Sequence, residues 1–451
     1  MLGALQDSVN RILNSSTAPM QYSYDAFIHV KATNKTHQAP KVIQLDVFRD
    51  YLNNYSDKTI IKIMLTGGVW AKQIYPHAKG LELTLIRTPF FNLDGRRGKH
   101  ASVERYTATL INHDSPNANL SKNAIAEEVL DLANLVEIEL ELISKTAEEI
   151  GLISCGGVAR QTTNVAFLRA VLNNEACQQL GDANITVKGV DIVEPIKALE
   201  REHIVIPHGT RLVDLPNYLQ QKCGGIYPSG LGYYLQDRYW YVYPAFDYAR
   251  LKDTERVITF VVVPPDSYPG VERTFAYNDR QLSALVTAGM VVANPTHAID
   301  RSLGNGVNFT TASSLLKDMS EAGANKVTFS RANANTETQT TTRADDKVFI
   351  RQSNKPITDN SYAEFSKIAA RSAATVTLIW DYSEAHAIVP GTMAKVYYLD
   401  DKVVKSMVGV ISAVHHYSYL IGKGYSNLRY GTSSAVQIKV DAGNLPKPTN
   451  S

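Results

Sequence analysis

The stretch Gly232-Tyr233-Tyr234-Leu235-Gln236-Asp237-Arg238-Tyr239-Trp240-Tyr241-Val242-Tyr243-Pro244 predicts the fold class of this chain. Two runs of aromatic and β-branched residues flank a polar turn at 236–238, which is the pattern of a β-hairpin. Cross-strand packing of the rings is the simplest interpretation, and it predicts that Trp240 and Tyr243 are buried. A base-stacking platform is the alternative. Against it, Arg238 is the only basic residue of the hairpin, and electrostatics usually dominates affinity for nucleic acid.

Short strands are predicted towards both ends of the chain. Runs rich in β-branched residues, separated by turn residues, fill 20–115 and recur in 375–440. In the middle, helices are expected at 120–135, 158–180 and 212–223, and strands at 136–142, 187–193 and 257–263. The sequence therefore predicts a β-rich, mixed α+β protein in which two similar antiparallel β barrels flank an α+β middle region.

The predicted domains follow this change of pattern. We expect an N-terminal β-barrel domain over 1–118, a mixed α+β middle region over 119–310 and a C-terminal β-barrel domain over 311–451. A chain of 451 residues exceeds what one hydrophobic core holds, so several domains are expected. The polar stretch 333–342, NANTETQTTT, predicts a mobile loop within the last domain, because it has almost nothing to bury.

Composition and charge disfavour several classes of protein. Hydrophobic residues make up 44% and charged residues 20% of the chain, which is typical of globular proteins. The net charge of +2 gives no footprint of nucleic-acid or acidic-membrane binding. No stretch is long and apolar enough to span a membrane, and no leader is expected. The excess of 24 tyrosines over 12 phenylalanines suits wet β surfaces and subunit interfaces.

No motif for catalysis, a cofactor or a metal rises above background. The chain lacks a phosphate-binding loop, a nucleophile elbow and paired CxxC motifs. The strongest candidates each have a simpler structural interpretation. They are His415 and His416 on opposite faces of one strand, His203 and His208 on an extended segment, Cys155, Cys177 and Cys223 as small buried residues, and Glu137, Glu139 and Glu141 on a solvated strand face. We therefore expect no enzyme, no catalytic, cofactor-binding or metal-binding residue, and no cofactor.

Several blocks of sequence occur in an order that carries a resemblance. They are HIVIPHGT at 203–210, LPNYLQ at 215–220, GIYPSGLGYY at 225–234, WYVYP at 240–244, YPGVERT at 268–274 and PGTMAKVYYL at 390–399. Taken together they resemble the central hub proteins in the baseplates of contractile-tailed bacteriophages, a family related in fold to the spike protein of type VI secretion. The likeness covers most of 120–440, whereas 1–118 matches in strand texture only.

The resemblance implies a structural virion protein without catalytic residues. Such a hub is a homotrimeric adaptor between the six-fold tail tube above and the three-fold spike below, with a lumen for DNA passage. The implied partners are the spike, the tube or its initiator, and the baseplate wedge and tape-measure proteins, without specific nucleic-acid binding or membrane insertion. The implied location is the tail baseplate of the virion, after assembly in the host cytoplasm. The alternative is a β-rich tail protein that binds or hydrolyses polysaccharide, which needs carboxylates and aromatic rings along a groove.

Overall fold

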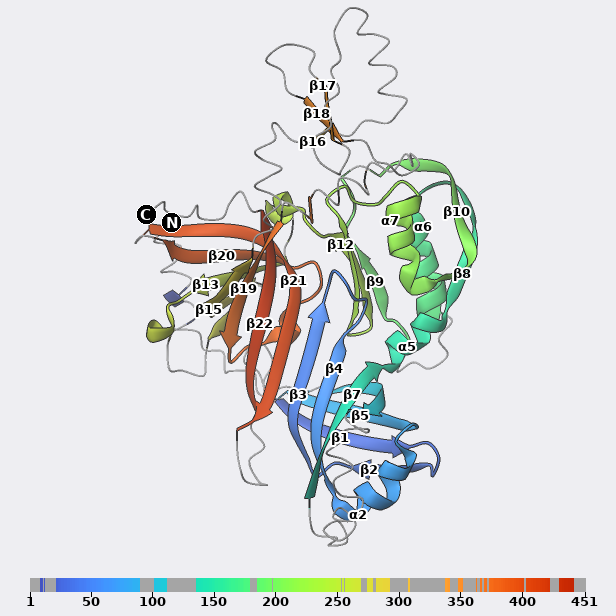
Figure 1. Cartoon of the computed structure of the whole chain (residues 1–451), viewed down its shortest axis with the longest axis vertical. Helices are drawn as coiled ribbons and strands as arrows, with labels where there is room; N and C mark the ends of the chain where they lie inside the picture. The colour runs from blue at the N-terminus through green and yellow to red at the C-terminus, as the bar shows by residue number, and fades with distance from the viewer. Residues whose placement is uncertain are drawn as a thin grey trace, which may run out of the picture.

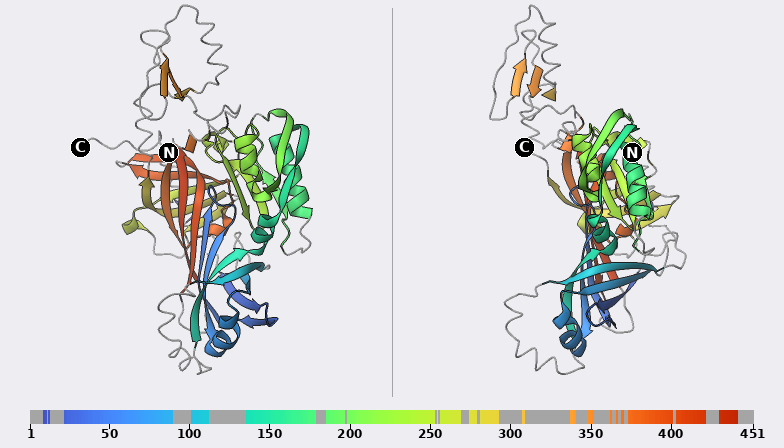
Figure 2. Two further views of the ribbon diagram at one scale, coloured as in Figure 1. Left: turned by 45° about the vertical axis from the view of Figure 1, so that its right-hand side comes forward. Right: turned by 90° about the vertical axis from the view of Figure 1, so that its right-hand side faces the viewer.

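A computed structural model shows how the chain is arranged (Figure 1). The residues it describes are 9–10, 12, 22–89, 101–111, 135–178, 185–196, 198–252, 254, 256–268, 274–278, 281–292, 307–308, 337–340, 348–351, 362, 366, 369–370, 373–400, 403–421 and 430–441. Within them, β strands dominate and the helices are few and short. In both views of Figure 2, the first sheet lies below the last barrel and the middle region.

Six antiparallel strands form the N-terminal sheet. They are β1 (Tyr22–Val30), β3 (Lys41–Asp50), β4 (Lys58–Thr66), β5 (Leu81–Pro89), β6 (Ser102–Leu110) and β7 (Leu135–Ser144). Their order is β1-β5-β6-β7-β4-β3. Burial alternates strictly along β1, as expected when one face of a strand lies against a core. The short β2 (Lys35–Gln38) extends the sheet beyond β1, and short helical turns from α2 (Gly67–Val69) to His77 separate β4 from β5.

Six further strands close into the C-terminal barrel. They are β13 (Val257–Val262), β15 (Gln281–Val292), β19 (Ala373–Asp381), β20 (Met393–Asp400), β21 (Val403–Leu420) and β22 (Tyr430–Asp441). Their order is β13-β20-β21-β22-β19-β15, and β15 pairs with β13 again. The expectation of a purely antiparallel barrel was wrong at one strand, because β13 runs parallel to both of its neighbours. A short β14 (Phe275–Asn278) pairs with β15.

The two sets of six strands share one order. Numbered along the chain within each set, both read first, fourth, fifth, sixth, third, second. The direction of the first strand differs, because β1 is antiparallel to the fourth strand of its set whereas β13 is parallel to its own. No ladder between β1 and β3 is present among the described strands. A backbone hydrogen bond from Ala39 N to Ala26 O (2.8 Å) continues the β1–β2 pairing by one residue. The predicted β-rich fold with two similar halves is confirmed, with one half a closed barrel and the other a sheet without a closing ladder.

A single long strand joins the two halves. The 18 residues of β21 pair with β20 over Val403–Val410 and with β3 over Ala413–Tyr419. Both halves thereby belong to one continuous hydrogen-bonded sheet. Figure 1 shows β3 beside β21 and β22 at this point. We call the β3–β21 ladder the seam.

The middle region combines a two-stranded ribbon, a three-stranded sheet and short helices. The ribbon is β8 (Ser154–Thr163) with β10 (Glu200–Arg211), and the sheet is β11 (Leu231–Gln236), β12 (Tyr239–Pro244) and β9 (Gly189–Ile192). The helices are α5 (Lys145–Leu152), α6 (Asn164–Val171) and α7 (Leu215–Lys222). Figure 1 shows α6 and α7 between the ribbon and the sheet, and one hydrophobic cluster runs through all three.

Most of the elements expected in the middle region are present. The helix expected at 212–223 forms as a 3-10 turn followed by α7, and it stops before Gly224 and Gly225, whose φ angles of +84° and +83° favour glycine. The helix expected at 158–180 was wrong at its start. There, 158–163 pair with β10 as part of β8, and the Thr163 hydroxyl caps α6 by accepting from Ala166 N (3.1 Å). The helix expected at 120–135 lies outside the described residues.

The predicted domain boundaries at 118 and 310 also lie outside the described residues and stay predictions. The strand pairing adds that β7, within the predicted middle region, belongs to the N-terminal sheet, and that β13 and β15 belong to the C-terminal barrel. Within the predicted loop 333–342, Glu337–Thr340 form β17, which pairs with β18 (Val348–Arg351). The rest of that loop is outside the described residues, so its mobility stays a prediction.

Candidate functional site

A polar network lies where the N-terminal sheet, the C-terminal barrel and the β11–β12 hairpin meet. We call it the junction network. Its members are Tyr22, Tyr24, Arg49, Tyr51, Asp57, Arg87, Tyr234, Gln236, Ser383, Glu384, His386, His416, Ser418 and Ser434. Most of these side chains are buried, which is unusual for charged residues and requires that they be paired.

Glu384 ties the barrel to the first strand of the N-terminal sheet. It follows β19, is 1% exposed, and accepts a hydrogen bond from the Tyr22 hydroxyl (2.9 Å). Arg87 of β5 lies over the Tyr22 ring at 5.4 Å. Burial raises the pKa of Glu384 to about 7, although the charge of Arg87 opposes this rise. A carboxyl group from one half is thus enclosed by side chains of the other half.

Two histidines in the network are held neutral. His416 of β21 is 1% exposed, with Nδ1 2.9 Å from Ser434 Oγ and Nε2 3.1 Å from Ser418 Oγ. Burial, together with the charges of two nearby arginines, lowers the pKa of His416 to about 3. His386 Nδ1 accepts hydrogen bonds from Arg87 and Arg49, and burial lowers the pKa of His386 well below its usual range. A proton on either ring would meet fixed positive charge.

Arg49 extends the network to the middle region. Its guanidinium, on the inner face of β3, donates to Asp57 at 3.1 Å and is only 3% exposed. The same carboxylate accepts from the Tyr234 hydroxyl of β11 (2.9 Å). Gln236 of the hairpin accepts from the Tyr51 hydroxyl (3.1 Å) and donates to the carbonyl oxygen of Ile388 (2.8 Å). All three parts of the molecule therefore contribute hydrogen bonds to one network.

The chemistry of the network is that of a rigid joint. Its donors and acceptors are directed at each other, and buried polar groups fix one arrangement because leaving a group unpaired is costly. The described exception is His386 Nε2, a buried atom without a hydrogen-bond partner. The network complements the seam, where backbone bonds hold β3 against β21.

The histidines singled out from the sequence all lie on β strands. His415 and His416 point to opposite faces of β21. His416 lies in the network, whereas His415 stacks on Phe48 (ring centroids 4.1 Å apart) with its Nε2 3.3 Å from Asp46 Oδ1. His203 and His208 are exposed on the extended strand β10.

The three cysteines are less buried than expected. Cys155, Cys177 and Cys223 are half-buried free thiols. They lie at the edges of the middle-region cluster, where the ribbon and helices leave one side of each residue open, so the prediction of small buried residues was wrong in degree. Burial still raises the pKa of each thiol, which disfavours the reactive thiolate.

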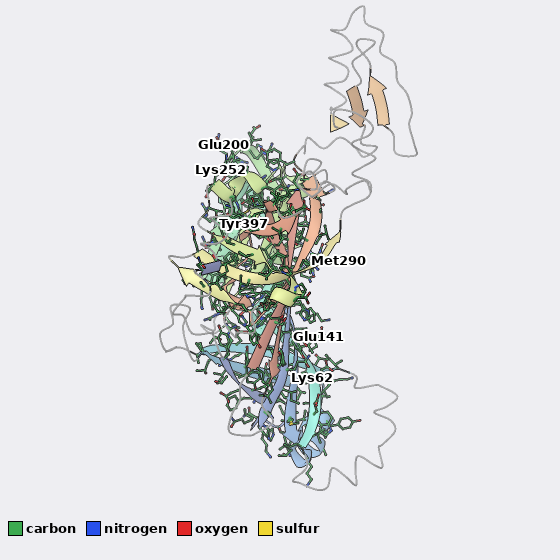
Figure 3. The ribbon with its side chains drawn as sticks, turned by 90° about the vertical axis from the view of Figure 1, so that its left-hand side faces the viewer. Lys62, Glu141, Glu200, Lys252, Met290 and Tyr397 are labelled. Atoms are coloured by element: carbon green, nitrogen blue, oxygen red, sulfur yellow. The ribbon has the colours of Figure 1, made fainter. Side chains whose placement is uncertain are left out.

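The glutamates of β7 form the predicted solvated face. Glu137, Glu139 and Glu141 alternate with buried Ile138 and Leu140. Figure 3 shows Glu141 and Lys62 on the surface of the lower sheet, and Glu141 pairs with Lys58 at 3.2 Å. An exposed ion pair of this kind contributes little to stability.

Trp240 and Tyr243 of the tyrosine-rich hairpin lie in the protein interior, whereas Tyr239 at its turn is exposed. Trp240 is 0% exposed and Tyr243 1% exposed, which confirms the prediction that both are buried. The Tyr243 ring covers Gly232 on the paired strand, where a Cβ atom would lie 2.4 Å from the ring. Both rings are therefore inaccessible as a stacking platform for bases or sugars.

Metal and membrane sites were sought within the described part of the chain. There, no three His, Cys, Asp or Glu residues come together to hold a metal ion. No described helix is long and apolar enough to cross a membrane. A cavity of about 420 Å³ lies under the ribbon, lined by residues that include Phe167, Ile206 and His208. A second, of about 110 Å³, lies between the middle region and the barrel.

The junction network was missed from the sequence because its members are scattered over some 400 positions. One signal was available. Arg49 follows Leu45 and Val47 at the inward-facing spacing of β3, so a charged residue occupies a core position. Its partners in other parts of the chain cannot be read from periodicity.

Comparison with known proteins gives matches at the level of structure. No protein-family model and no curated protein matches the chain. A tail protein from Neisseria meningitidis MC58 superposes with a TM-score of 0.43 and 11% identity, covering 94% of this chain and 98% of its own. The 43 kDa tail protein of prophage MuSo2 from Shewanella oneidensis gives 0.43 and 10%, covering 92% of this chain and 96% of its own.

A third match comes from a secretion system. A component of the type VI secretion system of E. coli, described as similar in structure to tail proteins of bacteriophage T4, gives a TM-score of 0.40 and 9% identity. The match covers 91% of this chain and 76% of the E. coli protein. The structural neighbours of this chain are thus phage tail and baseplate proteins and spike-related proteins of type VI secretion.

Proposed function

We propose that this chain is a structural protein of a phage tail baseplate, and that it forms the central hub as a homotrimer. In this role it is an adaptor between a six-fold tail tube above and a three-fold spike below, with a lumen for DNA passage. The observation that carries the proposal is the shared strand order of the two halves.

The shared order matters because of symmetry. A chain with two similar six-stranded halves presents two similar positions, so three chains in a closed ring present six. Closed cyclic symmetry is the usual arrangement of homo-oligomers, and it gives each exposed strand edge a neighbour. Such a ring matches a six-fold partner on one side and a three-fold partner on the other.

The junction between the halves supports a role in transmitting force between the tube and the spike. The seam and the junction network hold the N-terminal sheet, the barrel and the hairpin in one arrangement through backbone and side-chain hydrogen bonds. A protein that passes position or force from tube to spike needs its halves fixed relative to each other, and buried polar networks supply that specificity.

The proposed partners follow from the same role. They are the spike below, the tube or its initiator above, and wedge and tape-measure proteins at the periphery, within the tail baseplate of a virion assembled in the host cytoplasm. The chain is proposed to be no enzyme, to use no cofactor, and to bind neither specific nucleic acid nor membrane. In support, the titratable groups of the junction network largely satisfy each other, so they are poorly placed to act on a substrate. The polysaccharide alternative needs carboxylates and aromatic rings along one groove, and two rings of the hairpin, Trp240 and Tyr243, are buried.

The mass of the assembled protein tests the proposal. Native mass spectrometry of the purified chain, alone and with its spike partner, should give three times the chain mass of 49.8 kDa, plus the mass of the spike. Labelling of virions with an antibody against the chain should mark the tail end next to the baseplate. A monomer even with the spike bound, six copies per assembly, or labelling of the tail fibres alone would overturn the hub assignment.

A further inference from the structure

The 110 Å³ cavity lies where the middle region meets the C-terminal barrel. It is lined from three sides: by Asp191 and Val193 at and after β9 with Tyr241–Tyr243 of β12, by Arg250, Thr254 and Arg256 of the connection to β13, and by Pro390 and Gly391 before β20. A cavity of this size exceeds the space of one water several-fold. It is separate from the junction network.

Two guanidinium groups border the cavity, and one of them is incompletely paired. Arg250 donates from one terminal nitrogen to the carbonyl oxygen of Gly391. Its Nε atom is buried and has no hydrogen-bond partner. A buried polar atom without a partner is uncommon, and such an atom on a partly buried cation is more so.

No described carboxylate forms an ion pair with Arg250. Asp191 is the one carboxylate among the lining residues, and it forms an ion pair with Arg256. Asp247 acts on Arg250 electrostatically and offsets part of its charge, but it is not a lining residue of the cavity, and its Oδ1 accepts from the backbone N of Ala249 at 3.2 Å. Burial lowers the pKa of Arg250, and burial is the largest influence on it. The cavity therefore keeps a net positive lining.

We propose that this cavity is a binding site for a small oxyanion, held mainly by Arg250. Guanidinium groups bind phosphate and carboxylate oxygens through paired, parallel N–H donors, and the free Nε–H of Arg250 provides a donor for such a ligand. Arg256, which lies over the Tyr241 ring at 5.6 Å, places a second positive charge at the rim. The Thr254 hydroxyl, which accepts from Arg256 N at 3.2 Å, retains its own proton to donate.

The position of the site gives the anion a structural effect. Its lining residues come from the middle region, from the connection and from the loop that leads into the barrel, so a bound anion bridges all three. Binding to the folded protein alone would raise its stability by mass action. The inference is independent of the proposed hub function.

Titration with inorganic phosphate tests the site. Isothermal titration of the full chain at fixed ionic strength should show one phosphate per chain, and Arg250→Met should weaken binding by about tenfold or more, as expected for loss of a charge-assisted hydrogen bond. Lys252→Met is the matched control. Lys252 is exposed on the same short helical turn, does not line the cavity, and lies on the surface in Figure 3, so its loss should change affinity less than about twofold.

A second variant and a competition experiment complete the test. Arg256→Gln, at a partly exposed residue, serves if Arg250→Met does not fold, and it should weaken phosphate binding while circular dichroism stays unchanged. Competition with acetate separates the sources, because displacement indicates a carboxylate ligand and its absence a tetrahedral oxyanion. No phosphate or acetate binding by the unaltered chain, or equal losses in Lys252→Met and the arginine variants, would overturn the site.

Discussion

The N-terminal sheet and the C-terminal barrel share a strand order but treat their second strand differently. In the barrel, the second strand β15 pairs with the first strand β13 and closes the ring. In the N-terminal sheet, the second strand β3 pairs instead with β21 of the barrel. The edge that would close the first half thus forms the seam, and β21 is long enough, at 18 residues, to serve both halves.

The difference shows how two similar units become one continuous sheet. A free strand edge is a site for pairing with another strand. Here the backbone groups along the edge of β3 pair with β21 of the other unit. The cores differ accordingly. The closed barrel is filled around Trp380 with Phe260 and Phe275, whereas the open sheet has an aliphatic core bordered by tyrosines that face the junction network.

The largest effect is expected from emptying the closed barrel. Trp380 is fully buried and donates from Nε1 to the Thr274 hydroxyl at 3.1 Å. Trp380→Ala should lower the free energy of unfolding by about 3–5 kcal/mol because it leaves a large cavity. Urea denaturation measures this loss. Leu399→Ala, at an exposed site on the same barrel, should cost less than about 0.5 kcal/mol, and equal losses would contradict the described core.

The next effect concerns the junction between the halves. Arg49→Met leaves the partly buried carboxylate of Asp57 without its cation and should cost about 3 kcal/mol in unfolding free energy. Lys405→Met removes one side of an exposed ion pair with Asp400 on the barrel and should cost about 0–1 kcal/mol. The same denaturation experiment gives both values. A negligible loss for Arg49→Met would show that the network does not hold the halves together.

A smaller effect is expected from pH. His386 and His416 have folded-state pKa values below their ordinary value, so the unfolded chain binds more protons and stability falls as pH drops below about 6.5. Glu384, with a pKa raised to about 7, acts in the opposite direction between about pH 4.5 and 7, but the two histidines outweigh it.

Between pH 7 and pH 5, His416 alone should account for about 2 kcal/mol of lost stability. Unfolding free energies of the unaltered chain and of His416→Gln at both pH values measure this share. The variant should show a weaker pH dependence. An unchanged dependence would mean that His416 is not held neutral in the folded protein.

The smallest expected effect is a difference in amide hydrogen exchange between the open half and the closed half. Amides of β1 that face β3 lack a ladder, whereas β21 and β22 pair along most of their length. Hydrogen exchange should protect the β21–β22 amides at least about tenfold more than those amides of Tyr22–Ala26 in β1 that do not bond to β5. Equal protection would indicate that the first half also closes.

The sequence predicted the local elements better than their partners. Alternation of apolar and polar residues identified β7, and two strand-like runs around a polar turn identified the tyrosine hairpin. The paired glycines Gly224 and Gly225 identified the end of α7. Each of these signals spans only a few consecutive residues. The strand order, the reversed β13 and the seam depend on contacts between distant segments, such as Ala413 with Asp50, which periodicity does not encode. The helix expected at 158–180 was wrong over 158–163 for the same reason, since pairing with β10 decided the conformation of these residues.

In the proposed hub, the two halves occupy neighbouring, similar positions in a three-chain ring. Cryo-electron microscopy of the assembled protein tests it most directly, because the closed barrel and the open sheet can be told apart in a map. We expect three chains around one axis, and therefore six units, with N-terminal sheets and C-terminal barrels alternating around the ring. A ring of six chains, or a three-chain assembly in which only one of the two halves lines the central opening, would contradict it.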